Sequence, residues 1–145
     1  MLRKLFATLV MVVSFSSLAW GDDAKDDSLD GTWLPSSAEL GGTKFPDEVR
    51  KSLKLVIKDD KYTVTVEKQG TDEGTVKLMP SASPKAMDIT GSKGPNKGKT
   101  YLAIYEHKGD TLRICYDLSG KNRPTEFKSK EGTLLFLVEY KRQKE

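Results

Sequence analysis

The chain has one histidine and one cysteine, side chains that often act as general base and nucleophile in enzymes. A hydrolytic triad at His107 would need a nucleophile and an orienting acid beside it, and no serine lies in a nucleophile-elbow context. We therefore interpret His107 as a solvated turn histidine. Cys115 is interpreted as a small semi-buried hydrophobe, with a reactive or intermolecularly paired thiol as the alternative. The sequence predicts no catalytic residue, no metal site and no cofactor, and hence not an enzyme.

The segment from Ser92 to Thr100 ends in Gly-Lys-Thr, as a phosphate-binding loop does. Such a loop requires a glycine five residues before Gly98, where this chain has Lys93. It must also lead into a helix whose N-terminus receives the phosphate, whereas the residues that follow alternate as in a strand. We interpret the segment as a flexible basic loop.

The composition indicates a folded domain without a strong electrostatic field. The 145 residues are 37% hydrophobic and 31% charged, with a formal net charge of +3, which fits one domain. A charge this small gives no reason to expect binding to nucleic acid or to an anionic membrane surface. A single cysteine also excludes an internal disulfide framework.

Residues 1–21 are predicted to be a signal peptide for export. Arg3 and Lys4 precede an apolar run from Leu5 to Val13, and Ala19-Trp20-Gly21 supplies small residues before a cleavage point. Serines interrupt the apolar run before it reaches the length of a membrane span, so a retained anchor is only the alternative. We expect a protein of the periplasm or the extracellular space, with no stable membrane span after cleavage. Residues 22–30 are expected to be an acidic flexible tail.

From Gly31 onward the hydrophobic pattern has period two, which is typical of half-buried β-strands. Tight turns are expected at Asp59-Asp60-Lys61 and at Lys108-Gly109-Asp110. One short helix is predicted for Pro46 to Ser52, because proline and acids stand at its start and bases at its end. The expected strands cover residues 31–34, 53–58, 62–67, 76–78, 87–89, 99–106, 111–117 and 134–140.

About eight sequential strands joined mostly by short connections predict an all-β fold, an antiparallel up-and-down barrel with one short helix between strands 1 and 2. Closure into a barrel removes the two exposed edges that such a sheet would otherwise have. An open sandwich is the alternative. The barrel domain is expected to span residues 31–142, with residues 143–145 as a C-terminal tail.

Gly31, Trp33 and Arg142 carry a resemblance to the lipocalin signature. The glycine and the tryptophan stand on the first expected strand, and the arginine stands at the end of the last one. The resemblance implies that Trp33 closes one end of the core while a basic side chain from the final strand packs across its ring. A cation over an indole face is physically favourable. Lys141 is the other candidate for that role.

Longer runs carry a second resemblance: Pro84–Thr90, Gly98–Glu106, Gly109–Tyr116 and Arg123–Phe127. These runs are similar to the uncharacterised lipocalin-like domain that is abundant in small exported proteins of planctomycete bacteria. The resemblance extends over residues 31–142, almost all of the chain after the signal peptide. It implies a lipocalin-like barrel and export, and it brings no established activity and no catalytic or binding residues.

The inward-facing apolar side chains offer the candidate ligand site. The interior of an eight-stranded barrel is either just filled by side chains or holds one small ligand. These large side chains are consistent with an interior that they fill. The alternative is a small cavity in which tyrosine hydroxyls orient a ligand. The hypothetical ligand-binding pocket is lined by Tyr62, Val64, Met87, Tyr105, Tyr116 and Phe136.

We therefore expect non-catalytic binding of a small apolar or amphipathic molecule. The alternative is a closed-core protein-interaction module of the cell envelope, without a small-molecule ligand. That module would use an exposed apolar patch of Leu102, Ile104, Leu135 and Leu137, covered by a protein partner or by the helix. Fold alone establishes neither function.

Overall fold

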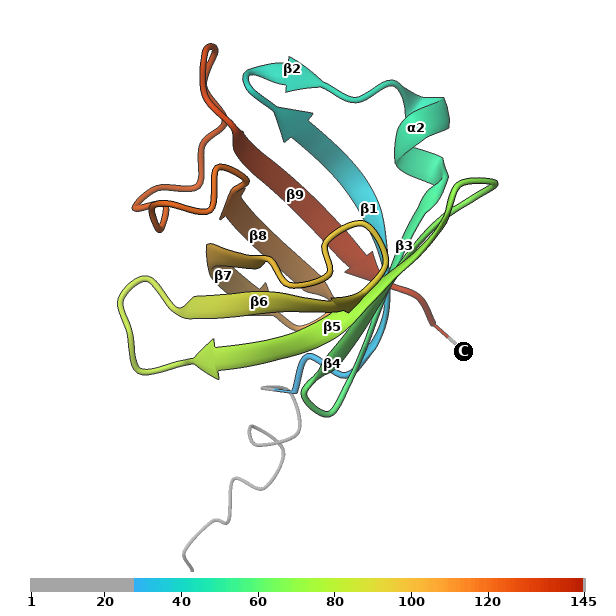
Figure 1. Cartoon of the computed structure of the whole chain (residues 1–145), viewed down its shortest axis with the longest axis horizontal. Helices are drawn as coiled ribbons and strands as arrows, with labels where there is room; N and C mark the ends of the chain where they lie inside the picture. The colour runs from blue at the N-terminus through green and yellow to red at the C-terminus, as the bar shows by residue number, and fades with distance from the viewer. Residues whose placement is uncertain (1–27, 145) are drawn as a thin grey trace, which may run out of the picture.

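The computed structural model describes residues 28–144, so the predicted signal peptide, residues 22–27 and Glu145 lie outside the described part of the chain. The described residues form nine β-strands and one short helix (Figure 1). In chain order these are β1 (Gly31–Leu40), β2 (Thr43–Lys44), α2 (Asp47–Lys51), β3 (Leu53–Lys58), β4 (Lys61–Val66), β5 (Gly70–Met79), β6 (Ala86–Lys93), β7 (Thr100–Lys108), β8 (Thr111–Asp117) and β9 (Leu135–Arg142).

Eight of these strands close into an antiparallel up-and-down barrel, as the sequence predicts. β1 pairs with β3, each strand from β3 onward pairs with the next, and β9 pairs back onto β1. Because this ring of pairings is complete, the open sandwich is excluded. The two-residue strand β2 only folds back on the far end of β1. The predicted helix is confirmed as α2, which lies between the first and second strands of the barrel.

The strand boundaries follow the alternation in the sequence, with β1 and β5 (expected only over residues 76–78) as the main exceptions. The bounds of β8 and the turn at Asp59-Asp60 confirm the prediction. The expected end of the first strand at Leu34 is wrong, because β1 continues to Leu40. Its register against β9 shifts between Pro35 and Ser37. A β-bulge absorbs the extra residue, so the pairing continues past a proline that indicates a strand end in the sequence.

Trp33 closes one end of the barrel, with the geometry that the lipocalin resemblance implies. Its side chain is 0% exposed, and its Nε1 donates a 2.8 Å hydrogen bond to the carbonyl oxygen of Leu29. The central guanidinium carbon of Arg142 lies 4.6 Å from the centre of the indole ring, which is within cation–π range. Lys141, the other candidate, instead donates a hydrogen bond to Thr111.

The closed end contains more residues than the sequence indicates. His107 is not a solvated turn residue: its ring packs edge-on against Trp33, with the ring centres 5.8 Å apart. Leu29 is not part of a flexible tail, because it is 3% exposed and belongs to the main apolar cluster. Gly31 has a φ of 142°, a conformation that favours glycine. These contacts form only when distant strands meet, so local patterns do not reveal them.

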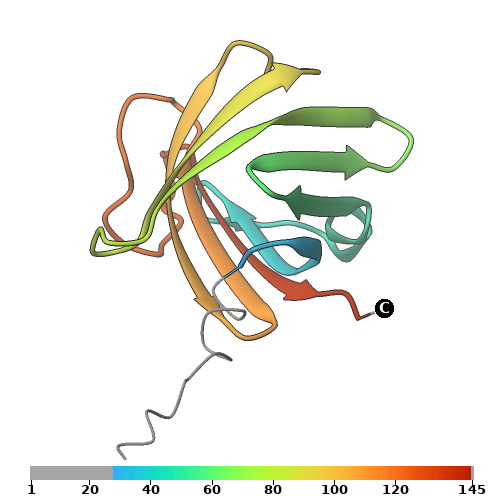
Figure 2. The same ribbon diagram turned by 90° about the horizontal axis from the view of Figure 1, so that it is seen from below.

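The long connection between β8 and β9 packs against the outside of the barrel wall (Figure 2). Arg123 fixes it there, donating hydrogen bonds to the carbonyl oxygens of Met87 and Ala103 at 3.1 and 2.9 Å. The same guanidinium forms a 2.6 Å ion pair with Asp88. Two backbone acceptors and a carboxylate therefore hold one arginine, an arrangement that anchors the connection firmly.

An apolar layer lies on the outer face of the wall. Ile104 and Cys115 are adjacent residues on β7 and β8, are 1% and 0% exposed, and do not belong to the interior cluster. The Cys115 thiol contacts the carbonyl oxygen of Lys128 in the outer connection at 3.5 Å. The expected exposed patch is therefore wrong for Ile104. Burial raises the pKa of the Cys115 thiol, which makes it a poor nucleophile and supports its interpretation as a small hydrophobe.

Candidate functional site

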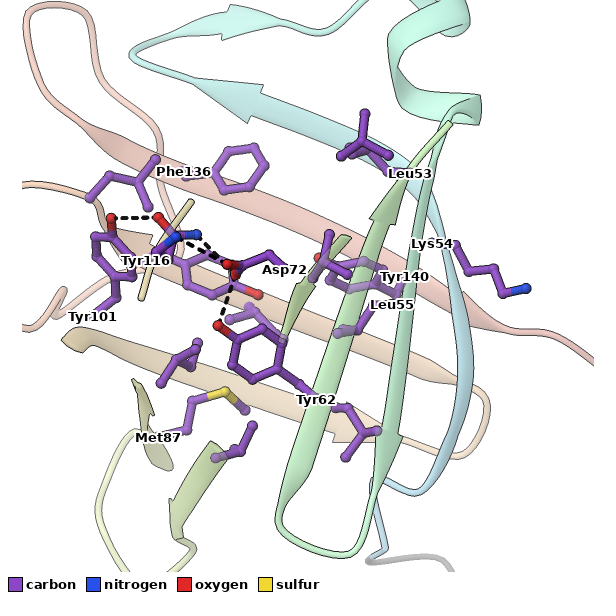
Figure 3. Close-up of a pocket in the computed structure, with 18 of the residues that line it drawn as sticks. Leu53, Lys54, Leu55, Tyr62, Asp72, Met87, Tyr101, Tyr116, Phe136 and Tyr140 are labelled. Atoms are coloured by element: carbon purple, nitrogen blue, oxygen red, sulfur yellow. Dashed lines mark hydrogen bonds between the residues drawn. The ribbon is translucent and has the colours of Figure 1, made fainter. Parts of the chain in front are cut away.

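A pocket of about 360 Å³ lies inside the barrel (Figure 3). Aliphatic side chains of β3 and β4, such as Leu55 and Val64, form one wall. Aromatic side chains from β7, β8 and β9 form much of the remaining surface, among them Tyr116 and Phe136. The interior is therefore not filled completely by side chains, and the pocket that remains is mostly apolar.

The structure brings five of the six predicted pocket residues around this space: Tyr62, Val64, Met87, Tyr116 and Phe136. Tyr105 does not line it and is instead buried in the core at 5% exposure. Tyr101, four residues earlier on the same face of β7, lines the pocket in its place. The alternation of a strand shows which face a residue occupies. It does not show how deep along the barrel that residue lies, and this is why Tyr105 is wrongly placed.

One carboxylate is buried among the residues of the pocket, and the sequence gives no hint of it. Asp72 is 9% exposed and points inward from β5. Its Oδ2 accepts hydrogen bonds from the hydroxyl of Tyr62 at 2.9 Å and from the side-chain amide of Asn96 at 3.0 Å. Its Oδ1 accepts a third from the backbone N–H of Asn96 at 3.0 Å. Figure 3 shows this carboxylate with the tyrosines drawn around it.

The loop from Gly94 to Lys99 lies across the barrel interior in Figure 1 and is fixed in place by this carboxylate. The sequence predicts a flexible loop here, but in the structure hydrogen bonds hold this segment in place. Gly91 donates a backbone hydrogen bond to the carbonyl of Lys99 and accepts one from Gly98, both 2.9 Å long. The hydroxyl of Tyr101 donates to the side-chain oxygen of Asn96 at 3.0 Å. Pro95 and Asn96 thereby become part of the pocket wall.

Stacked aromatic rings line the side of the pocket formed by the last strands. Phe136 stacks on Phe45 with ring centres 5.4 Å apart, and on Tyr116 with centres 5.7 Å apart. Phe45 comes from the segment before α2, so the helix connection contributes directly to the site. Offset ring pairs of this kind hold their members in a defined geometry, which makes this wall rigid.

The tyrosines of the pocket retain their protons at high pH. Burial raises the pKa of Tyr62, and the carboxylate of Asp72 that accepts its hydrogen bond raises it further. Burial also raises the pKa of Tyr116, with further contributions from Tyr140. The pKa of Tyr140 is raised to about 12 by burial, against a small opposing effect of its hydrogen bond with Tyr116. These hydroxyls are therefore neutral polar groups at physiological pH.

The free energy of unfolding is expected to fall as the pH rises from about 10 to about 12. Above pH 10 the unfolded chain loses the proton of Tyr140 while the native chain keeps it, so the native state binds more protons and stability decreases. One such tyrosine contributes a slope of about 1.4 kcal/mol per pH unit. Urea unfolding at several pH values, followed by circular dichroism, measures the slope.

The matched control for this measurement is Tyr140→Phe, which keeps the ring and removes the ionisable hydroxyl. Lysines and the distant tyrosines titrate in both proteins, so the difference between the two slopes reports Tyr140 together with its effect on the pKa of Tyr116. Equal slopes in the two proteins would show that Tyr140 titrates alike in the folded and unfolded chains, contrary to the effect of its burial.

Within residues 28–144, no group of three or more histidine, cysteine, aspartate or glutamate side chains is placed to hold a metal ion. Over the same residues, no helix has the length and hydropathy needed to cross a bilayer. The polar groups that face the pocket are tyrosine hydroxyls, an asparagine amide and the Asp72 carboxylate. Lys54 also borders the pocket, but it is exposed and its ammonium group points away from the pocket (Figure 3). Hydroxyl, amide and carboxylate groups are hydrogen-bonding groups of the kind that fix the orientation of ligands in apolar pockets.

Comparison of the chain with protein-family models, with curated proteins and with solved structures finds no match. The geometry of the pocket is therefore the basis for proposing a function. Asp72, Asn96 and Tyr101 belong to that geometry, although they do not stand out in the sequence.

Proposed function

We propose that this protein is an exported, non-catalytic barrel of the lipocalin-like type that binds one small apolar or amphipathic molecule. The observation that carries the proposal is the pocket of about 360 Å³ with its mostly apolar wall. Small-molecule sites typically have volumes of about 300–1,000 Å³ and combine apolar walls with a few fixed polar groups. The pocket is at the small end of that range, which favours a compact ligand.

Two features of the chain support the remaining parts of the proposal. The basic and then apolar first 21 residues favour export. The arrangement of Gly31, Trp33 and Arg142 at the closed end supports a lipocalin-like relationship. The alternative function depended on an outer apolar patch, and Ile104 in that patch is 1% exposed. The pocket is thus the better basis for a function.

The neutral fluorescent probe N-phenyl-1-naphthylamine tests the pocket directly. We expect its emission to increase on binding to the wild-type protein with 1:1 stoichiometry. Val64→Phe replaces a small aliphatic side chain that lines the pocket with a bulky aromatic ring, which reduces the space for the probe. We expect it to weaken probe binding at least about tenfold, which corresponds to about 1.4 kcal/mol. Fluorescence titration measures both affinities.

The matched control is Thr65→Phe, which adds the same ring at the neighbouring exposed position of β4. We expect it to leave the affinity unchanged, because successive side chains of a strand point to opposite faces. Equal binding by wild type and Val64→Phe would contradict the proposal. Native mass spectrometry of protein purified from its own host extends the test, since a co-purifying small mass is expected for a carrier.

A further inference from the structure

The carboxylate of Asp72 is buried without a cationic partner. In the part of the chain that the structure describes, no lysine or arginine forms an ion pair with it. Two partly buried acids elsewhere in the described chain are paired with arginines: Asp88 with Arg123, and Glu106 with Arg113. Burial of a charge is costly unless it is compensated. Three hydrogen bonds compensate Asp72 in part, while its negative charge stays unpaired inside an apolar pocket.

The hydrogen bonds leave one acceptor position of this carboxylate unused. An ionised carboxylate offers about four acceptor positions, and Asn96 and Tyr62 use three of them. Two of the three bonds are on Oδ2, so Oδ1, with only the backbone N–H of Asn96, holds the remaining capacity. Tyr62 and the loop also fix the orientation of the side chain, which spares the ligand the entropic cost of ordering it.

The rings around Asp72 favour a positive charge as well. Tyr62, Tyr101 and Tyr116 line the same pocket (Figure 3). The face of an aromatic ring carries negative electrostatic potential and attracts a cation, most strongly where water is displaced. The one lysine that borders the pocket, Lys54, is exposed and directs its ammonium group away from Asp72 (Figure 3). The carboxylate and the aromatic rings therefore give this space a negative electrostatic potential. An anionic ligand would be repelled there, while a neutral one would gain only hydrogen bonds.

We infer that the natural ligand carries a protonated amino group, which binds Asp72, on a compact apolar body, which fills the aliphatic side of the pocket. This inference rests on the proposed function, because it names the chemical class of the ligand for the same site. The ammonium N–H groups donate to the free position on Oδ1. The apolar body lies against Leu55, Val64 and Met87, which line the pocket.

Displacement of N-phenyl-1-naphthylamine by three compounds with the same phenyl group and similar size tests the charge preference. The compounds are 2-phenylethylamine, 2-phenylethanol and 3-phenylpropanoate, which are cationic, neutral and anionic at pH 7. We expect the amine to displace the probe at a concentration at least about tenfold lower than the alcohol, and the propanoate to be the weakest. Asp72→Asn, which keeps the size and removes the charge, is expected to bring the amine and the alcohol to equal potency.

Glu73→Gln is the matched control, since it removes one carboxylate from the adjacent position of β5, which faces away from the pocket. It is expected to keep the preference for the amine. If Asp72→Asn fails to fold, the test still rests on the wild type, where the concentrations of amine and of alcohol that displace the probe are compared. If the amine and the alcohol displace the probe at about the same concentration, the ammonium inference is overturned. The proposed function stays intact in that case if the probe binds and Val64→Phe weakens its binding. Failure of the probe itself to bind overturns both.

Discussion

Trp33→Ala is expected to lower the free energy of unfolding by about 3–5 kcal/mol, the loss typical of truncating a fully buried large aromatic side chain. The indole is 0% exposed and donates its N–H to the carbonyl of Leu29. Its removal would leave a cavity at the closed end of the barrel. It would also take the aromatic partner from both Arg142 and His107, so a partly buried guanidinium would lose the ring face on which it lies.

Urea unfolding followed by far-ultraviolet circular dichroism measures this loss. The matched control is Leu34→Ala at the next position of β1, where the side chain is 39% exposed. Surface positions of this kind usually change stability by less than about 0.5 kcal/mol. A loss below about 1 kcal/mol in Trp33→Ala would mean that the tryptophan does not close the barrel.

The role of Trp33 could be predicted because the resemblance to the lipocalin signature connects residue types with strand positions. Gly31 and Trp33 stand on the first strand, Arg142 stands on the last, and barrel closure brings the two strands together. His107 and Leu29 complete the same end but could not be predicted. Their contacts depend on where β7 ends and on the path of the chain before β1, neither of which leaves a periodic pattern in the sequence.

The strands were predicted well where apolar and polar residues alternate, and poorly where pairing overrides local preference. Residues 70–74 read Gly-Thr-Asp-Glu-Gly, a composition typical of a turn, and were not assigned to a strand. They nevertheless form the first half of β5, paired with β4 along their whole length. Closure of the barrel requires a strand at this place, and hydrogen bonding to a neighbour outweighs the weak propensity of these residues.

Asp72 and Asn96 were missed in the sequence because tertiary pairing, and not local sequence preference, places them in the candidate site. The apolar pocket residues were found from the alternation, but Asp72 could be recognised as an inward residue only once β5 was known to begin at Gly70. Asn96 reaches the carboxylate from a loop, through contacts across 24 residues of sequence. A polar residue buried by tertiary pairing gives no signal in a hydrophobicity pattern, and in this chain it is the residue that distinguishes the pocket.

Gly74→Ala is expected to destabilise the protein by about 2–3 kcal/mol, within the range for overpacking a tightly packed interior. Gly74 is inside β5, at the point where the register against β6 shifts. A Cβ atom there would collide with the backbone carbonyl oxygen of Thr90 and would lie 2.6 Å from Cε1 of Tyr62. The carbonyl belongs to the neighbouring strand and cannot rotate away as a side chain can.

The sign of the change in the free energy of unfolding shows whether steric overlap or chain entropy dominates in Gly74→Ala. Alanine in place of a strand glycine would by itself stabilise the fold by about 0.5–1 kcal/mol, because glycine loses more freedom on folding. Thr75→Ala, at the exposed neighbouring position, is the matched control and is expected to change stability by less than about 0.5 kcal/mol. Gly74→Ala should also shift the ring of Tyr62 away from Asp72 and weaken binding of N-phenyl-1-naphthylamine. A variant that is as stable as the wild type and binds the probe equally would show that this glycine does not make room for the ring on which the pocket depends.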